Sequence, residues 1–230
     1  MATAKHNSDQ VPPEKNVRSQ WGKALDAGTP SSMQVQHVPG YEDNAVDLFC
    51  LTDTFTAEEC ERLIALSEAE GYGFTNYPKA YRGNLRLITT DPRLSAVYWE
   101  RLKPHVPHTI HQGGAEWEAV GLNECWRLAK YFPGDRFGAH VDARFIRSQD
   151  EHSMYTVNIY MNDGFKGGST RFYKSDSTKE GPAAAVIPRT GMALIFRQPP
   201  AFDYLHDGEQ LVSGLKYLFR TDVMYRRMRK

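Results

Sequence analysis

The pattern of short apolar runs in the second half of the chain constrains the fold most strongly. From about residue 120, runs of β-branched and aromatic residues alternate with Gly, Pro and Asp, and no helical period intervenes. Such punctuated runs are typical of strands joined by tight turns. Seven strands of this kind predict an all-β sandwich or barrel. The runs cover 122–132, 136–141, 154–162, 169–173, 184–187, 192–197 and 216–225.

Two amphipathic helices are predicted ahead of these strands. A capping-box sequence, Thr56 to Glu59, precedes apolar residues at helical spacing, which predicts a helix over 57–70. A second helix is predicted over 91–103, because an Asp-Pro pair opens it. An apolar run at 45–51 predicts one earlier strand. The expected fold class is therefore α+β and mainly β, with the N-terminal helices flanking the β core.

A polar segment precedes these elements. Residues 1–44 contain four prolines and no sustained apolar period, so a flexible or extended N-terminal arm is expected there. Residues 45–230 then form one domain, a size that suits a single core. Within that domain we expect helical support over about 45–119 and the β core over about 120–226.

Charge and hydropathy restrict the partners of the chain. Lys and Arg number 28, as do Asp and Glu, whereas nucleic-acid binders usually have a basic excess, so no nucleic-acid partner is expected. No apolar run approaches the roughly 18 residues that span a bilayer, and no secretory signal is recognisable. The three widely spaced cysteines argue against a disulfide framework. A cytoplasmic protein without a membrane partner is expected, and its oligomeric state stays open.

His140, Asp142 and His206 are the candidate metal ligands. Positions i and i+2 of a strand point the same way, so His140 and Asp142 can converge on one ion. His206 must then come from a neighbouring strand. Two imidazoles and one carboxylate are the facial set that holds Fe(II) and leaves coordination sites open. Zn or Mn fits the same ligands, and the alternative is three ordinary polar residues at strand ends.

Lys216 is a candidate anion-binding residue. It lies inside the apolar run 215–219, where a lysine must either reach solvent or neutralise a buried anion. On a strand beside the metal, it is placed to bind the far carboxylate of a bound dicarboxylate. The alternative is a lysine on the solvated face of an edge strand.

Several short segments occur around these residues in a definite order. They are KYFPGDRFGAHVD at 130–142, YMN at 160–162, GGSTRF at 167–172, PRTG at 188–191 and RTDV at 220–223. In order and spacing they resemble the catalytic domain of 2-oxoglutarate- and Fe(II)-dependent dioxygenases of the prolyl 4-hydroxylase type. The resemblance covers about 122–226. It implies a double-stranded β-helix, jelly-roll or cupin-like, with the metal at its open end.

The resemblance also implies cofactors and residue roles. His140, Asp142 and His206 would bind Fe(II), and Lys216 would bind the C5 carboxylate of 2-oxoglutarate. The implied reaction consumes O2, hydroxylates an unactivated C–H bond and releases succinate and CO2, with ascorbate as the reductant. Tyr131 and Tyr160 match positions of tyrosines that hydrogen-bond the co-substrate in the family, although both could instead be core aromatics. Arg220 lies four residues beyond Lys216 on the same strand face, so it could contact the co-substrate or the substrate, or form a surface ion pair.

The resemblance leaves the substrate open. It implies either a peptidyl residue of the prolyl type or a small molecule such as a free amino acid. The loop 143–153 follows Asp142 and borders the metal site, so its residues Arg144 and Arg147 are candidate substrate contacts. The alternatives are a nucleic-acid or protein demethylase of the same superfamily, and a non-catalytic cupin-like module that binds metal or ligand.

Overall fold

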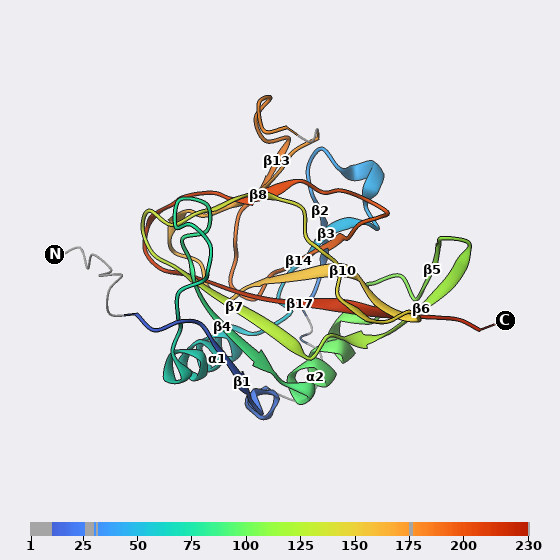
Figure 1. Cartoon of the computed structure of the whole chain (residues 1–230), viewed down its shortest axis with the longest axis horizontal. Helices are drawn as coiled ribbons and strands as arrows, with labels where there is room; N and C mark the ends of the chain where they lie inside the picture. The colour runs from blue at the N-terminus through green and yellow to red at the C-terminus, as the bar shows by residue number, and fades with distance from the viewer. Residues whose placement is uncertain (1–10, 26–29, 31, 175–176, 230) are drawn as a thin grey trace.

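A large sheet dominates the computed structural model, which describes residues 11–25, 30, 32–174 and 177–229 (Figure 1). Only β1 and β4 pair in parallel along its main path; the other neighbours are antiparallel. The path runs β1 (Lys15–Arg18), β4 (Leu85–Thr90), β7 (Cys125–Tyr131), β17 (Lys216–Arg227), β10 (Glu151–Tyr160), β14 (Ala193–Arg197), β3 (Leu48–Leu51) and β2 (Val35–His37). Strands β5 (Thr109–Gln112), β6 (Ala115–Leu122) and β9 (Ile146–Ser148) attach to its side.

A smaller sheet lies across the first, and Figure 1 shows its strands β8 and β13 above β7, β10 and β17. Aromatic residues such as Phe172 and Phe196 fill the space between the two sheets. This arrangement of facing antiparallel sheets confirms the predicted mainly β fold of the double-stranded β-helix type. The small sheet runs β13 (Ala184–Val186), β12 (Thr170–Phe172), β15 (His206–Gly208) and β8 (Phe137–His140), and a separate pair joins β11 (Lys166–Gly167) to β16 (Leu211–Ser213).

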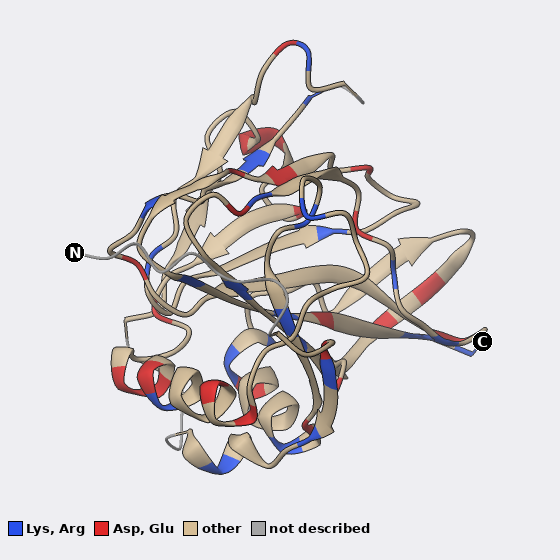
Figure 2. Ribbon diagram, turned by 60° about the vertical axis from the view of Figure 1, so that its left-hand side comes forward, with Lys and Arg blue, Asp and Glu red and all other residues tan. Residues whose placement is uncertain are grey.

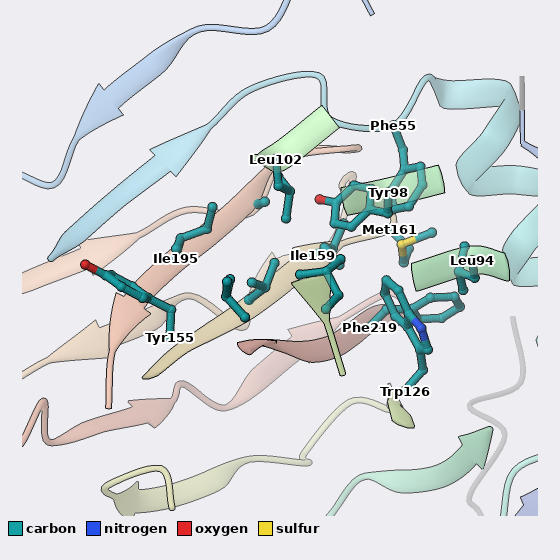
Figure 3. Packing of buried hydrophobic residues seen from close by; sticks show 14 of the residues in the cluster. Phe55, Leu94, Tyr98, Leu102, Trp126, Tyr155, Ile159, Met161, Ile195 and Phe219 are labelled. Atoms are coloured by element: carbon teal, nitrogen blue, oxygen red, sulfur yellow. The ribbon is translucent and has the colours of Figure 1, made fainter. Parts of the chain in front are cut away.

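Two α-helices cover the other face of the large sheet. Helix α1 (Ala57–Glu70) begins with the predicted capping box, and helix α2 (Pro92–Leu102) begins where the Asp91 carboxylate accepts a bond from the third amide beyond it. Figure 3 shows Tyr98 and Leu102 of α2 beside apolar side chains of the sheet. Both predicted helices are confirmed, and neither has an apolar stretch long enough to cross a membrane. Two short 3-10 helices lie at Trp21–Ala24 and Glu42–Asn44.

The first half of the chain is less helical than predicted. Strands β4, β5 and most of β6 lie within 45–119, where only the strand at 45–51 was expected. Strand β4 alternates strictly between buried and half-buried residues, but its arginine and threonines obscure that period in the sequence. Strands β5 and β6 form a hairpin over Gly113 and Gly114, whose positive φ angles of 61° and 71° suit a two-residue turn.

The described part of 1–44 lies against the domain. Strands β1 and β2 extend the two ends of the large sheet, and Trp21 is buried against α2 and its neighbours. Residues 1–10, 26–29 and 31 of the expected arm lie outside the described residues. The proposed boundary between arm and domain at residue 44 stays a prediction.

Candidate active site

The three predicted ligands meet at one end of the small sheet. His140 closes β8, His206 opens β15, and the two residues are directly paired across these strands. Asp142 follows β8 by two residues and turns to the same point. Its carboxylate oxygens lie 3.6 Å from His140 Nε2 and 3.9 Å from His206 Nε2. All three ligand atoms lie within 4.8 Å of one another, which is close enough to bind one ion.

The backbone orients both imidazoles toward this point. His140 Nδ1 lies 2.9 Å from the carbonyl oxygen of Gly138, and His206 Nδ1 lies 2.8 Å from that of Tyr204. A carbonyl oxygen can only accept, so each Nδ1 carries its proton and donates. Each Nε2 is therefore left with a free lone pair, as a metal ligand requires.

The protonation states also suit a metal. Burial alone would raise the pKa of Asp142, but Arg220 and the two histidines hold it at about 2. Burial, together with His206, lowers the pKa of His140 to about 4. At neutral pH the aspartate is therefore charged and His140 is neutral, the forms that bind metal. This donor set fits the facial two-histidine, one-carboxylate arrangement for Fe(II).

Two side chains hold the Asp142 carboxylate in place. The hydroxyl of Thr156 on β10 donates to Oδ2 over 2.9 Å, and Nη1 of Arg220 on β17 lies 3.1 Å from Oδ1. Gln198 in turn donates to the Thr156 hydroxyl over 2.9 Å. The large sheet thus positions a ligand that belongs to the small sheet.

We expect Thr156→Val to weaken metal binding by about 10- to 100-fold, because outer hydrogen-bond partners orient the ligands of metal sites. Thr221→Val is the matched control, since that buried hydroxyl donates to the Asn123 carbonyl oxygen and not to the carboxylate. Calorimetric titration of both variants with Mn(II) measures the effect. Equal losses of metal affinity in the two variants would show that the effect comes from packing and that Thr156 does not position the carboxylate.

Lys216 is buried at the start of β17, with only 3% of its surface exposed. Its Nζ donates to the carbonyl oxygen of Gly168 over 2.5 Å, and no described carboxylate lies within ion-pair distance. Burial lowers the pKa of this ammonium to about 8. A buried cation without a carboxylate partner is costly, so the site favours an anion that arrives from outside the chain.

The predicted tyrosines flank this lysine. Tyr131 on β7 is paired with Lys216 across the sheet, and its ring centroid lies 5.2 Å from Nζ. The ring of Tyr160 on β10 lies 5.5 Å from Nζ. The Tyr160 hydroxyl shares a hydrogen bond of 2.7 Å with Thr170. Both rings are buried, and Tyr131 lines the cavity described next.

A cavity of about 300 Å³ joins the metal ligands to Lys216. Arg220 and Arg144, for which contacts to the co-substrate and the substrate were expected, both line it, and those roles stay predictions. Arg147 lies outside the lining, since it forms ion pairs with Glu124 and, over 2.6 Å, with Glu151. Strand β9 and the start of β10 form part of the segment expected as a loop. The lining includes six further polar residues that were not predicted, which are Arg86, Arg127, Asn158, Thr170, Asp207 and Asp222, and Tyr77 and Arg82 line the cavity as well.

One signal for two of the missed residues was present in the sequence. Arg127 lies four positions before Tyr131 in the same strand, and Asn158 lies two before Tyr160, so each shares a strand face with a predicted site residue. Arg82 lies in the irregular segment ahead of β4. The segment 71–84 around it is rich in aromatic and polar residues, a pattern that fits either a pocket wall or a Gly-punctuated turn, and tertiary packing decides between the two.

Comparison with known proteins places this site in context. Residues 126–221 match the sequence model of the 2OG-Fe(II) oxygenase superfamily, a range that includes all three candidate ligands and Lys216. The search of curated proteins gave no match.

Solved structures share the fold. A Trichoplax adhaerens prolyl hydroxylase, in complex with a hypoxia inducible factor peptide fragment, aligns with a TM-score of 0.56 at 14% identity, over 80% of this chain and 86% of its own. A Pseudomonas putida prolyl-4-hydroxylase gives 0.54 at 19% identity, over 82% and 97%. The viral collagen prolyl hydroxylase of Paramecium Bursaria Chlorella virus-1, solved with 2OG, gives 0.51 at 17% identity, over 77% and 94%. At these identities the likeness concerns the fold.

Proposed function

We propose that this chain, which belongs through residues 126–221 to the 2OG-Fe(II) oxygenase superfamily, hydroxylates an unactivated C–H bond of a peptidyl residue or a small molecule. One observation carries the proposal. A buried metal-ligand triad and a buried ammonium face the same cavity, so the chain presents both halves of a site for a metal and a dicarboxylate.

The residues of the cavity have distinct roles in this reaction. His140, Asp142 and His206 hold Fe(II). When bound, Fe(II) and 2-oxoglutarate supply the activation of O2, with release of succinate and CO2. Lys216 would bind the C5 carboxylate by charge and hydrogen bonding. Its burial between the rings of Tyr131 and Tyr160 keeps water from this ion pair. Tyr131 lines the same part of the cavity and restricts where the dicarboxylate can lie.

Succinate formation tests the proposal without knowledge of the substrate. The purified protein is incubated with Fe(II), 2-oxoglutarate and ascorbate, which we expect to serve as reductant, and succinate is quantified by mass spectrometry. We expect slow succinate formation that requires iron and stops when a chelator is added. A protein that binds both Fe(II) and 2-oxoglutarate but forms no succinate would instead be a non-catalytic binding module.

The buried lysine predicts a pH dependence for co-substrate binding. With a pKa of about 8 in the free protein, Lys216 is charged below that pH and loses its proton above it. Since the dicarboxylate binds the charged form, its dissociation constant should be constant near pH 7 and rise by up to about tenfold per pH unit above 8. Calorimetry with Mn(II) in place of iron measures this. A dissociation constant that stays unchanged up to pH 9.5 would show that Lys216 does not bind the dicarboxylate.

A further inference from the structure

The wall of the cavity opposite the small sheet is unusually rich in arginine. Arg127 on β7 and Arg220 on β17 are directly paired across neighbouring strands, and Arg86 lies on the next strand, β4, beside Arg127 on the same face. Figure 2 shows basic bands crossing these central strands. Like charges directly opposite each other destabilise a sheet, so the row does not serve stability. A ligand that needs these charges is the physical alternative.

The carboxylates of the chain neutralise only part of this row. Arg86 forms an ion pair with Glu14, and its Nη2 donates to Oε1 of that carboxylate over 2.6 Å. Asp222 serves two guanidinium groups at once, since it lies 3.2 Å from Arg220 and 3.5 Å from Arg127. Arg220 also lies against Asp142. The only described carboxylate within ion-pair distance of Arg127 is therefore that of Asp222, which lies closer to Arg220.

Two more arginines at the same cavity have no described carboxylate within ion-pair distance. Arg82 stacks its guanidinium over the ring of Phe137 at 4.3 Å, and that ring stacks in turn on His140 at 3.8 Å. Its Nε donates to the amide oxygen of Asn84 over 3.2 Å. Burial lowers the pKa of Arg82, and the nearby charges of Arg86 and Arg220 lower it further. Arg144 lies two residues beyond Asp142 and also lines the cavity.

The cofactors of the proposed reaction do not supply the missing negative charge. Divalent iron, the Asp142 carboxylate, the 2-oxoglutarate dianion and the Lys216 ammonium together carry no net charge. Asp222 balances Arg220, Glu14 balances Arg86, and Asp207 forms an ion pair with Arg171 over 2.6 Å. The charges of Arg82, Arg127 and Arg144 remain. Nε of Arg220 and Oδ1 of Asn158, paired residues that line the cavity, are also buried without a hydrogen-bond partner. Unpartnered buried polar atoms at a cavity indicate a polar ligand.

We propose that the substrate carries an oxyanion, either a carboxylate or a phosphate, that is bound by Arg82 and Arg127, with Arg144 at the edge of the cavity. Guanidinium groups bind both anions through paired hydrogen bonds. The inference rests on the proposed function, because it assigns the substrate of the same cavity. Arg82 links the two sites, since it stacks on Phe137, whose ring stacks in turn on the metal ligand His140.

Binding of matched acid and neutral probes tests the oxyanion site. The protein is loaded with Mn(II) and N-oxalylglycine, an unreactive analogue of 2-oxoglutarate, so that Lys216 and the metal are already occupied. Calorimetry then compares N-acetylproline with N-acetylprolinamide, and phenyl phosphate with phenol. We expect at least one acid to bind about ten times more tightly than its neutral partner, which corresponds to about 1.4 kcal/mol. The pair with the larger preference for the acid shows whether the site binds a carboxylate or a phosphate.

Variants locate the binding site. Arg82→Met and Arg127→Met should each remove most of the preference for the acid, and Arg82→Lys should keep part of it. Arg18→Met, an exposed position on β1, is the control and should keep the full preference. Melting curves of the loaded proteins confirm that each variant is folded. Equal binding or no binding of acid and neutral probes, or a preference that survives both Arg→Met variants, would overturn the proposal.

This experiment separates the two proposals. Wild-type protein that forms succinate but shows no preference for acids would overturn the oxyanion site and leave the proposed function intact. Protein that prefers acids but forms no succinate would overturn the proposed function.

Discussion

Asp142→Ala is expected to abolish succinate formation and to weaken Fe(II) binding by at least about 100-fold. Loss of an outer partner alone costs about 10- to 100-fold in metal sites, and loss of a ligand costs more. Without this carboxylate only the two imidazoles remain, and Arg220 places its positive charge 3.1 Å from where the carboxylate was. Metal content by mass spectrometry and succinate formation under saturating 2-oxoglutarate measure the two losses.

Asp142→Asn and Asp91→Ala separate charge from folding in this test. The asparagine side chain of the first variant keeps the volume and one carbonyl oxygen but lacks the charge, so this variant should also lose the metal. Asp91 is equally buried, but it caps α2 on the far face of the large sheet. Its replacement should lower the melting temperature and leave metal affinity unchanged. Turnover that survives in Asp142→Ala would show that the metal is bound elsewhere.

Lys216→Met is expected to raise the Michaelis constant for 2-oxoglutarate by roughly 30-fold or more while the metal-free protein becomes no less stable. Removing one member of a buried charge pair costs about 2–5 kcal/mol of binding. The stability of the metal-free protein should not fall in this variant. The pKa of Lys216 falls from 10.5 to about 8 on folding, so the charged lysine opposes folding at neutral pH, and this penalty disappears only as the pH rises from 8 to 10.5.

The matched control for this prediction is Lys130→Met. Lys130 lies on β7, one strand away, but on the helix side of the sheet, where it pairs with Glu68 over 2.7 Å. Its replacement should leave the Michaelis constant unchanged. Steady-state kinetics and thermal melts of the metal-free proteins give the two readouts. A melting temperature that falls in Lys216→Met, together with equal losses of iron and 2-oxoglutarate binding, would assign a structural role to the lysine.

Local rules were sufficient to predict the helices and the convergence of His140 with Asp142. A capping box and an Asp-Pro opening depend on neighbours within one turn, so both helices were predicted to within about a residue at each end. The spacing of His140 and Asp142 predicted that they converge, because i and i+2 of an extended chain point the same way, although β8 ends at His140 and Asp142 lies just beyond it. The pairing of β8 with β15 does not follow from spacing, since the two strands are far apart in the sequence.

The rest of the site depends on long-range register. Arg127 and Arg220 meet only because β7 and β17 pair in one particular alignment. Arg147 forms ion pairs with Glu124 and Glu151 and not with the cavity. Because Glu124 lies far from Arg147 in the sequence, in the turn between β6 and β7, no local rule predicts that pair. Strand β4 was missed for a similar reason, because Arg86 in its middle faces a cavity that other strands build.

A crystal structure of the protein with Mn(II) and N-oxalylglycine tests the central claim most directly. We expect one anomalous peak bonded to Nε2 of His140, Nε2 of His206 and an oxygen of Asp142, with the far carboxylate of the analogue against Nζ of Lys216. A metal peak away from these three side chains, or an analogue whose far carboxylate does not contact Lys216, would contradict the assignment of this cavity as the oxygenase site.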